Sequence, residues 1–158
     1  MTSTCKSANP EIVYGASKLI AERMVINSGG GVARFFNVVQ SQGNVFEIWR
    51  NLSVDEPIRV MGECNRYFIS IDEACSLAMF AMVNGAGRYI VNTPELRNMD
   101  DIAGILYPDR EKNMSTRRRG DRKDEIFLAS SEKETEDLLN GSVLRIIGDH
   151  DLVGDFTE

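Results

Sequence analysis

The sequence predicts an α/β protein in which strands and helices alternate along the chain. Short apolar runs rich in β-branched and aromatic residues, at 32–39, 58–61 and 88–91, indicate buried strands. Apolar residues at helical spacing indicate helices between and after these runs, at 10–28, 45–52, 72–83 and 99–106. Alternation of this kind favours a sheet with at least partly parallel pairing.

The ends of these elements follow from local signals. Asn9 suits a helix cap, Pro10 suits the first helical position, and the glycines at 29–31 end that helix. We expect no strand before this helix. Further along, 67–71 is expected to be extended, 109–123 to be a polar loop with a short strand, and 132–139 to be a last helix. An acidic tail follows Gly148.

Charge and size limit the kind of partner. A chain of 158 residues is long enough for one compact domain, and its formal net charge of −6 argues against nucleic acid or an anionic membrane as a partner. The positive charge is concentrated between Arg110 and Lys123, where seven Lys and Arg residues stand against two acidic ones. This local patch favours a small anionic ligand.

The cysteines and the hydropathy bear on the compartment. Three cysteines without C-x-x-C spacing predict neither a disulfide framework nor a zinc or other metal site. No apolar run approaches the roughly 20 residues that span a membrane, and the first residues lack a secretory signal pattern. We therefore expect a cytoplasmic protein.

A tyrosine and a lysine on the first helix are candidates for acid–base chemistry. Tyr14 and Lys18 are four positions apart, so their side chains lie on one helix face. A nearby ammonium favours the phenolate form of tyrosine, and the same ammonium can bond a ribose hydroxyl. Taken alone, the spacing also fits two unrelated surface side chains.

The residues around this pair carry a family resemblance. The segment S-T-C-K-S-A-N-P-E-I-V-Y-G-A-S-K at 3–18 resembles the S-T-D-K…Y-G-x-[ST]-K segment of extended short-chain dehydrogenase/reductases. The nearest branch is the CapD-type nucleotide-sugar dehydratases and epimerases of polysaccharide biosynthesis. Three further segments resemble that family in the same order, namely R-F-F-N-V-V-Q-S-Q-G at 34–43, R-Y-F-I-S-I-D-E-A at 66–74 and R-R-G-D at 118–121.

The resemblance implies the C-terminal part of a Rossmann-type doubly wound sheet plus a small α/β substrate-binding domain. It assigns 1–50 and 67–93 to the distal Rossmann elements, 51–66 and 94–148 to the substrate-binding part, and 149–158 to the tail. The implied reaction uses NAD or NADP and passes through a 4-keto sugar. The implied substrate is a UDP-sugar or another nucleoside-diphosphate sugar.

The resemblance also assigns roles to single residues. Catalytic roles fall to Tyr14, Lys18, Lys6, Thr4 and Cys5, and the cofactor contact to Tyr14 and Lys18. Substrate contacts fall to Asn37, Arg66 and Arg118, because arginine offers forked charged donors to a phosphate. All three should converge on one site, which Tyr14 and Lys18 should face from their helix with Lys6 close by. The two guanidinium groups should lie within roughly 10 Å of each other, about the span of a diphosphate and its contacts. For 117–119 the alternative is a solvated basic turn.

Two departures from the family pattern affect the expected activity. Cys5 stands where the family has an acidic residue that takes part in elimination, and a thiol is a poor substitute for a carboxylate. This favours an epimerase, a reductase or a weakened dehydratase. The glycine-rich strand-to-helix turn that cradles the cofactor pyrophosphate does not occur in this sequence, and the glycines at 29–31 join a helix to a strand instead.

These departures leave a second hypothesis open. The chain would then be a non-catalytic module that binds a nucleotide-sugar, or that assembles with a partner supplying the missing half. Under either hypothesis we expect no tight NAD(P) binding by this chain alone. We also expect self-association, because a sheet that lacks its neighbours leaves an edge open.

Overall fold

The computed structural model describes residues 1–92, 95–117, 121–148 and Asp151, and the chain divides into two compact units. The first unit comprises Met1–Phe36, Asp72–Thr93 and Ile126–Glu158, and the second comprises Asn37–Ile71 and Pro94–Glu125. This division differs from the one expected from the sequence. The chain leaves the first unit at Phe36 and not after residue 50, and 126–148 returns to it.

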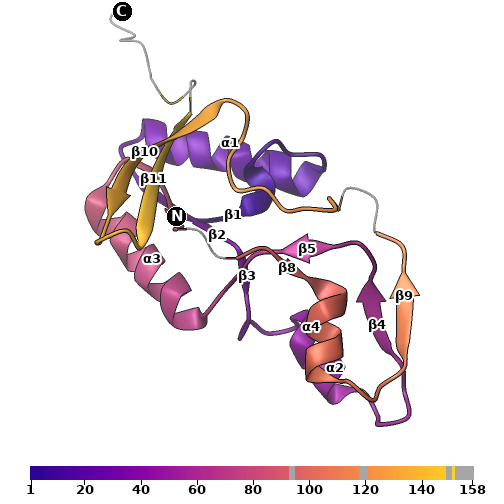
Figure 1. Cartoon of the computed structure of the whole chain (residues 1–158). Helices are drawn as coiled ribbons and strands as arrows, with labels where there is room; N and C mark the ends of the chain where they lie inside the picture. The colour runs from indigo at the N-terminus through magenta and orange to yellow at the C-terminus, as the bar shows by residue number, and fades with distance from the viewer. Residues whose placement is uncertain (93–94, 118–120, 149–150, 152–158) are drawn as a thin grey trace, which may run out of the picture. The chain divides into compact units, whose positions relative to one another are not determined.

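The first unit is built on a five-stranded sheet (Figure 1). Its strands, in spatial order, are β1 (Thr2–Thr4), β2 (Gly31–Phe35), β7 (Gly87–Val91), β11 (Val143–Gly148) and β10 (Glu132–Leu138). The first three are parallel, and β11 and β10 add an antiparallel hairpin beside β7. The runs expected as strands at 32–39 and 88–91 thus contribute parallel neighbours to one sheet, but the first run does so only as far as Phe35, because Asn37–Val38 pairs in a separate sheet.

Two helices cover opposite faces of this sheet (Figure 1). Side chains alternate along a strand, so Ala33 and Tyr89 face one side, where they pack with Leu77 and Ala81 of α3 (Ile71–Asn84). The residues next to them on the strands face the other side, toward α1 (Val13–Asn27). The sheet is thus buried on both faces, as expected for a doubly wound α/β fold.

Within its described residues, the second unit contains two short helices and three two-stranded sheets. Its helices are α2 (Val45–Asn51) and α4 (Met99–Leu106), which begin at the positions expected from the sequence. The strand pairs are β3 (Asn37–Val38) with β6 (Phe68–Ile69), β4 (Ile58–Met61) with β9 (Lys112–Ser115), and β5 (Asn65–Arg66) with β8 (Arg97–Asn98). The core beneath the helices consists of Trp49, Ile58, Val60, Cys64, Met99 and Ala103.

The helix expected at 132–139 is wrong, because this segment forms strand β10. Glutamate and lysine favour helices, but here the segment pairs with β11 along almost its whole length. The turn that joins the two strands has three residues with left-handed backbone, Leu139, Asn140 and Gly141, with φ of 51°, 53° and 90°. Pairing across the hairpin therefore outweighs the local helix propensity.

The start of the chain also differs from expectation. A strand, β1, precedes the first helix and pairs in parallel with β2, although none was expected. Helix α1 starts at Val13 and not at Pro10, because Asn9 has a left-handed backbone with φ of 46°. The side chain of Asn9 instead accepts a hydrogen bond from the backbone N–H of Ser130, at 3.3 Å. The cap signal at 9–10 therefore serves the loop before the helix.

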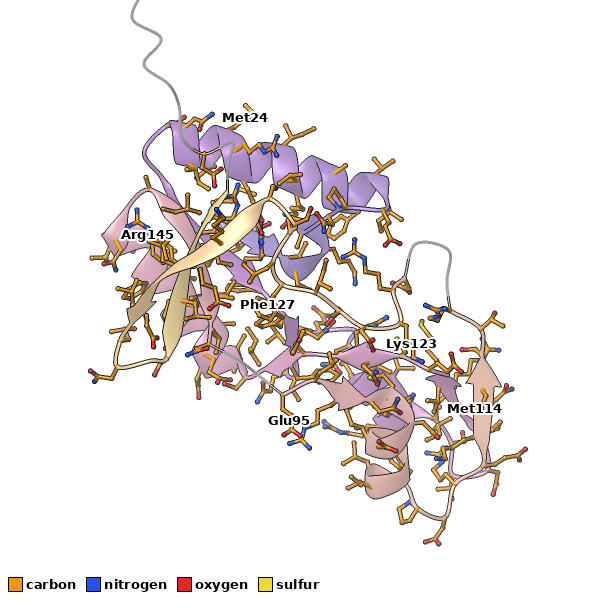
Figure 2. All side chains as sticks on the ribbon, turned by 45° about the horizontal axis from the view of Figure 1, so that its top comes forward. Met24, Glu95, Met114, Lys123, Phe127 and Arg145 are labelled. Carbon is orange, nitrogen blue, oxygen red and sulfur yellow. The ribbon has the colours of Figure 1, made fainter. Side chains whose placement is uncertain are left out.

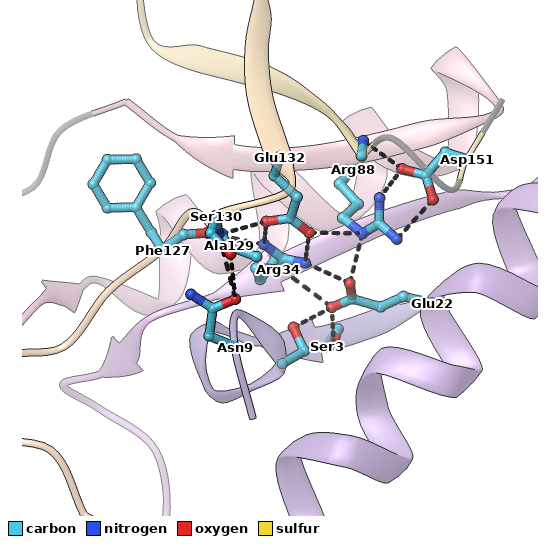
Figure 3. Close-up of polar contacts among 12 residues, drawn as sticks. Ser3, Asn9, Glu22, Arg34, Arg88, Phe127, Ala129, Ser130, Glu132 and Asp151 are labelled. Atoms are coloured by element: carbon cyan, nitrogen blue, oxygen red, sulfur yellow. Dashed lines mark hydrogen bonds and ion pairs between the residues drawn. The ribbon is translucent and has the colours of Figure 1, made fainter. Parts of the chain in front are cut away.

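A buried cluster of charged groups joins α1 to the sheet (Figure 3). Glu22 of α1 is fully buried, and its Oε2 accepts hydrogen bonds from Arg34 Nη2 of β2 and Arg88 Nε of β7, both at 2.6 Å. Its Oε1 accepts from the hydroxyls of Ser3 and Ser7, at 2.5 and 2.6 Å. One carboxylate thus connects β1, the turn after it, α1, β2 and β7.

Two more carboxylates complete the cluster. Glu132 of β10 accepts hydrogen bonds from both terminal nitrogens of Arg34, each at 2.7 Å. Asp151 forms an ion pair with Arg88. Arg34 therefore bridges two carboxylates, and Arg88 contacts three, since its Nε also lies 3.6 Å from Glu132 Oε1. Buried charges require such partners, because a buried charge is costly unless it is paired and hydrogen-bonded.

These contacts fix the charge states of the cluster. Burial alone would raise the pKa of the Glu22 carboxyl, but the hydrogen bonds and charge of Arg34, with the hydroxyls of Ser3 and Ser7, lower it below the ordinary value of 4.5. Burial acts to lower the pKa of Arg34 and Arg88, yet their carboxylate partners raise both. Glu22 is therefore ionised and both arginines are protonated at neutral pH.

A close approach between α1 and the turn after β1 depends on glycine. A Cβ on Gly15 would lie 2.3 Å from the carbonyl oxygen of Lys6 and 3.0 Å from Pro10 Cβ, so a larger residue cannot fit without moving the backbone. Gly15 directly follows Tyr14. The glycine therefore lets the helix that carries Tyr14 and Lys18 pack against the backbone of Lys6.

Replacing Glu22 by glutamine should destabilise the protein by about 3 kcal/mol at neutral pH, because breaking a buried ion pair leaves the arginines with an uncompensated charge. The folded pKa of Glu22 is lowered, so its stabilisation is complete above pH 4.5 and is lost as the pH falls through the folded pKa. Urea unfolding should thus show a difference in the free energy of unfolding between wild type and E22Q, and this difference should shrink below pH 4.5. The exposed D109N should unfold like wild type, and an equal gap at every pH would contradict this assignment.

Gly15→Ala should destabilise the protein by about 1–3 kcal/mol, the usual cost of overpacking, although alanine is the better helix former. Gly104→Ala in α4 is the matched control, because its Cβ would meet only the flexible end of Lys112, at 3.5 Å from Nζ. This control should be neutral or stabilising by up to about 1 kcal/mol. Thermal unfolding of both variants measures the difference, and equal behaviour would contradict the close approach.

Candidate functional site

The segment that resembles the family's catalytic strand end lies at the carboxyl end of β1. Thr4 is the last residue of the strand, and its hydroxyl accepts a hydrogen bond from the backbone N–H of Lys6 at 3.4 Å. Its carbonyl accepts another from the hydroxyl of Ser7 at 2.7 Å. Thr4 thus begins a short 3-10 turn, Cys5–Ser7, at the strand edge where parallel α/β sheets bind ligands.

Cys5 is buried at this strand end, with a relative exposure of 4%. Its Sγ lies 4.0 Å from the hydroxyl of Thr4. The position where the family pattern has an acid is therefore occupied by an enclosed thiol, whereas the neighbouring Lys6 is only half-buried. Of these two side chains, Lys6 is the one with more access to a ligand.

Tyr14 and Lys18 lie on α1, one turn apart. Tyr14 is 51% exposed and Lys18 is half-buried. The hydroxyl of Ser17 donates to the backbone carbonyl of Tyr14 at 2.9 Å, so this contact does not involve the phenol of Tyr14. In the described part of the chain no hydrogen bond links the tyrosine and lysine side chains. Both side chains are therefore accessible to a ligand.

In the second unit, Asn37 and Arg66 meet at a carboxylate that the sequence analysis missed. Asn37 Nδ2 donates a hydrogen bond to Glu125 Oε2 at 2.8 Å, and Arg66 Nε lies 3.7 Å from Glu125 Oε1. The backbone N–H of Tyr67 also donates to Glu125 Oε2, at 3.1 Å. Arg66 and Glu125 are buried, at 8% and 7% relative exposure.

Much of the Arg66 guanidinium is used inside the protein. Nη1 donates to the backbone carbonyls of Asn65, Arg122 and Lys123, at 2.8, 3.1 and 3.3 Å. The backbone of Arg122 and Lys123 is therefore held against β5. Arg118 itself lies outside the described residues, so its expected approach to Arg66 stays a prediction, as does convergence with Tyr14 and Lys18, which belong to the other unit.

The charges that organise the first unit were not predicted from the sequence. Arg34 was identified only as part of a motif, and no ion pair was predicted for Glu22, Arg88 or Glu132. An arginine in the middle of the apolar run at 32–39 was the available signal, because such a charge is buried only with a partner. Glu125 gave a weaker signal, as an acidic residue directly before the apolar Ile126 and Phe127.

Several other features bear on the chemistry that this chain can supply. All three cysteines are free thiols, and burial raises the pKa of Cys64. In the described ranges, no three or more His, Cys, Asp or Glu side chains form a group that would hold a metal ion. None of the helices described has the length and apolar character of a membrane crossing.

Comparison with known proteins agrees with the family resemblance of the sequence. A family model described as polysaccharide biosynthesis protein matches residues 1–145. An inverting UDP-N-acetylglucosamine 4,6-dehydratase of Campylobacter jejuni is 28% identical over 145 residues, which cover 82% of this chain and 43% of that protein. The capsular polysaccharide biosynthesis protein CapD of Staphylococcus aureus is 31% identical over 156 residues, which cover 89% of this chain and 24% of CapD. The chain thus spans less than half the length of these relatives.

A solved structure supports the fold. The X-ray structure of Pen from Bacillus thuringiensis matches with a TM-score of 0.74 at 21% identity, over 93% of this chain and 51% of that one. The expected Rossmann-like α/β fold is therefore confirmed. With the family model matching from Met1 to Arg145, this chain belongs to the polysaccharide biosynthesis protein family, in its CapD-type dehydratase and epimerase branch.

Proposed function

We propose that this chain is the part of an NAD(P)-dependent nucleotide-sugar dehydratase or epimerase that carries the catalytic helix and the substrate-binding unit. The observation that carries the proposal is the accessible pair Tyr14 and Lys18 on a helix that packs, through Gly15, against the backbone of Lys6. The names of the similar proteins add the substrate class, a UDP-sugar used for polysaccharide biosynthesis.

The chain's own residues fit one end of the cofactor. A phenol and an ammonium on one helix face suit the ribose and nicotinamide end, whereas the glycines at 29–31 join α1 to β2 and so cannot form a strand-to-helix pyrophosphate cradle. When bound, NAD(P) would supply oxidation of the sugar at C4. We expect no tight NAD(P) binding by this chain without further sequence that supplies the cradle.

Each catalytic residue then has a defined task. Tyr14 takes the proton from the C4 hydroxyl of the sugar, and the positive charge of Lys18 stabilises the phenolate that accepts it. The half-buried side chains of Thr4 and Lys6 lie at the strand end, where they bind the sugar oxygens. Elimination or epimerisation follows from the 4-keto sugar, and the enclosed thiol of Cys5 favours epimerisation over a full 4,6-dehydration.

The same thiol favours a second function, a module that binds a nucleotide-sugar without catalysis. Cys5 is 4% exposed and replaces an acid, so a proton donor for elimination is missing at this position. In this case Tyr14 and Lys18 would remain from an enzyme ancestor, and nucleotide-sugar binding would remain the activity. Measurement of turnover distinguishes the two functions, because only the enzyme converts the nucleotide-sugar.

We also propose that the first unit associates with another chain or with further sequence. Strand β1 lies at the edge of the sheet. Helix α1 exposes Val13, Ile20 and Met24, at 86%, 61% and 66%, and Figure 2 shows Met24 projecting from it. On α3, Met79, Met82 and Val83 are exposed as well. Apolar side chains on both helices are features of surfaces that are covered in an assembly.

The enzyme proposal predicts that Tyr14→Phe blocks turnover without blocking binding. We would co-express the chain with the part of the Campylobacter dehydratase that it does not match, and measure conversion of UDP-N-acetylglucosamine. Loss of the phenolic proton should reduce turnover by about 10²–10⁴-fold. Calorimetry on the chain alone should show that Y14F binds the nucleotide-sugar as wild type does.

Ser17→Ala is the control, because it removes a hydroxyl from the same helix that contacts only the backbone of Tyr14. This variant should keep turnover within a few-fold of wild type. Binding without turnover in the wild-type assembly would favour the non-catalytic module. If the wild-type chain binds no nucleotide-sugar, both functions are wrong.

A further inference from the structure

The amide of Asn37 has both of its N–H donors engaged inside the second unit. Nδ2 donates to the backbone carbonyl of Tyr67 and to Glu125 Oε2, each at 2.8 Å. A primary amide has two N–H groups and one carbonyl oxygen. The side chain of Asn37 is half-buried, and its carbonyl oxygen Oδ1 is therefore the polar atom that can still contact a ligand.

The opposite orientation of this amide is excluded by charge. Turning the side chain over would place Oδ1 against the carbonyl oxygen of Tyr67 and the carboxylate of Glu125, two acceptors that cannot donate a proton. The carboxylate is the stronger of the two, because hydrogen bonds to a charged acceptor are about twice as strong as neutral ones. Glu125 thus decides which end of the amide faces outward.

Glu125 is itself held firmly in place. Its backbone N–H donates to the carbonyl of Asn65 at 3.2 Å, and the backbone N–H of Asn65 donates to the carbonyl of Lys123 at 2.7 Å. The Asn65 side chain donates to Asp124 Oδ1 at 2.5 Å. With 7% exposure and Arg66 beside its other oxygen, the carboxylate cannot turn away from Asn37 without breaking several contacts.

An amide that offers an oxygen selects the chemistry of its ligand. Phosphate oxygens accept hydrogen bonds and do not donate them, so an outward Oδ1 repels a diphosphate. It binds a hydroxyl or an amide N–H instead. Arg66 can still donate to a phosphate through Nη2, because the contacts with the backbone carbonyls and with Glu125 use Nη1 and Nε.

We propose that Glu125 is a positioning residue that makes Asn37 a hydrogen-bond acceptor for a hydroxyl or N–H of the sugar moieties, and not a donor to the diphosphate. This inference rests on the proposed nucleotide-sugar function. The hydroxyl or N–H that donates to Asn37 belongs either to the ribose or to the sugar attached to the diphosphate, which we call the second sugar. Uridine diphosphate, which has only the ribose, and UDP-N-acetylglucosamine, which has both, distinguish these sources.

The test compares the affinities of Asn37→Ala, Glu125→Gln and the double variant for UDP-N-acetylglucosamine, uridine diphosphate and inorganic diphosphate, by calorimetry on the full chain. In E125Q the new amide can donate to Asn37, so the Asn37 amide is free to turn. Each single variant should weaken UDP-N-acetylglucosamine binding by about tenfold, and inorganic diphosphate binding should stay unchanged. The double variant should lose no more than either single one, because Glu125 acts through Asn37.

Glu63→Gln is the control, since it removes the same charge in the same unit from an exposed glutamate 3.9 Å from Lys123. It should leave all three affinities unchanged. Loss of uridine diphosphate binding to the same extent assigns the contact to the ribose, and its retention assigns it to the second sugar.

Two results would overturn the inference while leaving the proposed function intact. One is weakened inorganic diphosphate binding by N37A and E125Q, which would make Asn37 a phosphate donor. The other is an additive loss in the double variant, which would mean that Glu125 acts independently of Asn37. If wild type binds neither nucleotide, the proposed function fails and the inference fails with it.

Discussion

The first unit depends on the pairing of Glu22 with Arg34 and Arg88. A fully buried carboxylate between two buried guanidiniums is tolerable only if every group keeps its partners, so the elements that supply them are held in one arrangement. Those elements include α1 and the turn after β1, through Ser3 and Ser7. The helix that carries Tyr14 and the strand end that carries Thr4 and Lys6 are thereby fixed to the same sheet.

The second unit also depends on a buried carboxylate, which has fewer charged partners. Glu125 accepts hydrogen bonds from Asn37 and Tyr67 and lies beside Arg66, so one buried carboxylate sets the orientation of two groups assigned to the substrate. In both units, then, a buried glutamate positions residues to which the proposed function gives a role. Such supporting contacts restrict the ligand-binding side chains to one geometry before a ligand arrives, which lowers the cost of binding.

Much of the fold was predictable from local patterns, and the exceptions have identifiable causes. The helices at 45–51 and 99–106 and the strands at 58–61 and 87–91 follow from apolar periodicity and turn residues. Strand β10 was not predictable, because its charged residues favour a helix and only pairing with β11 makes it a strand. Motif resemblance predicts substrate contacts for Asn37 and Arg66. It could not identify Glu125 or Glu22, because their roles arise from partners that are distant in sequence.

The central claim is that Glu125 orients Asn37 in the second unit for binding a nucleotide-sugar. The most direct measurement is a titration of the ¹⁵N-labelled chain with UDP-N-acetylglucosamine, followed by backbone amide chemical shifts in NMR spectra. The account predicts saturable shifts with one dissociation constant at Asn37 and Tyr67, which both donate hydrogen bonds to Glu125. Shifts that spare both residues, or that are confined to the hairpin of β10 and β11, would contradict it.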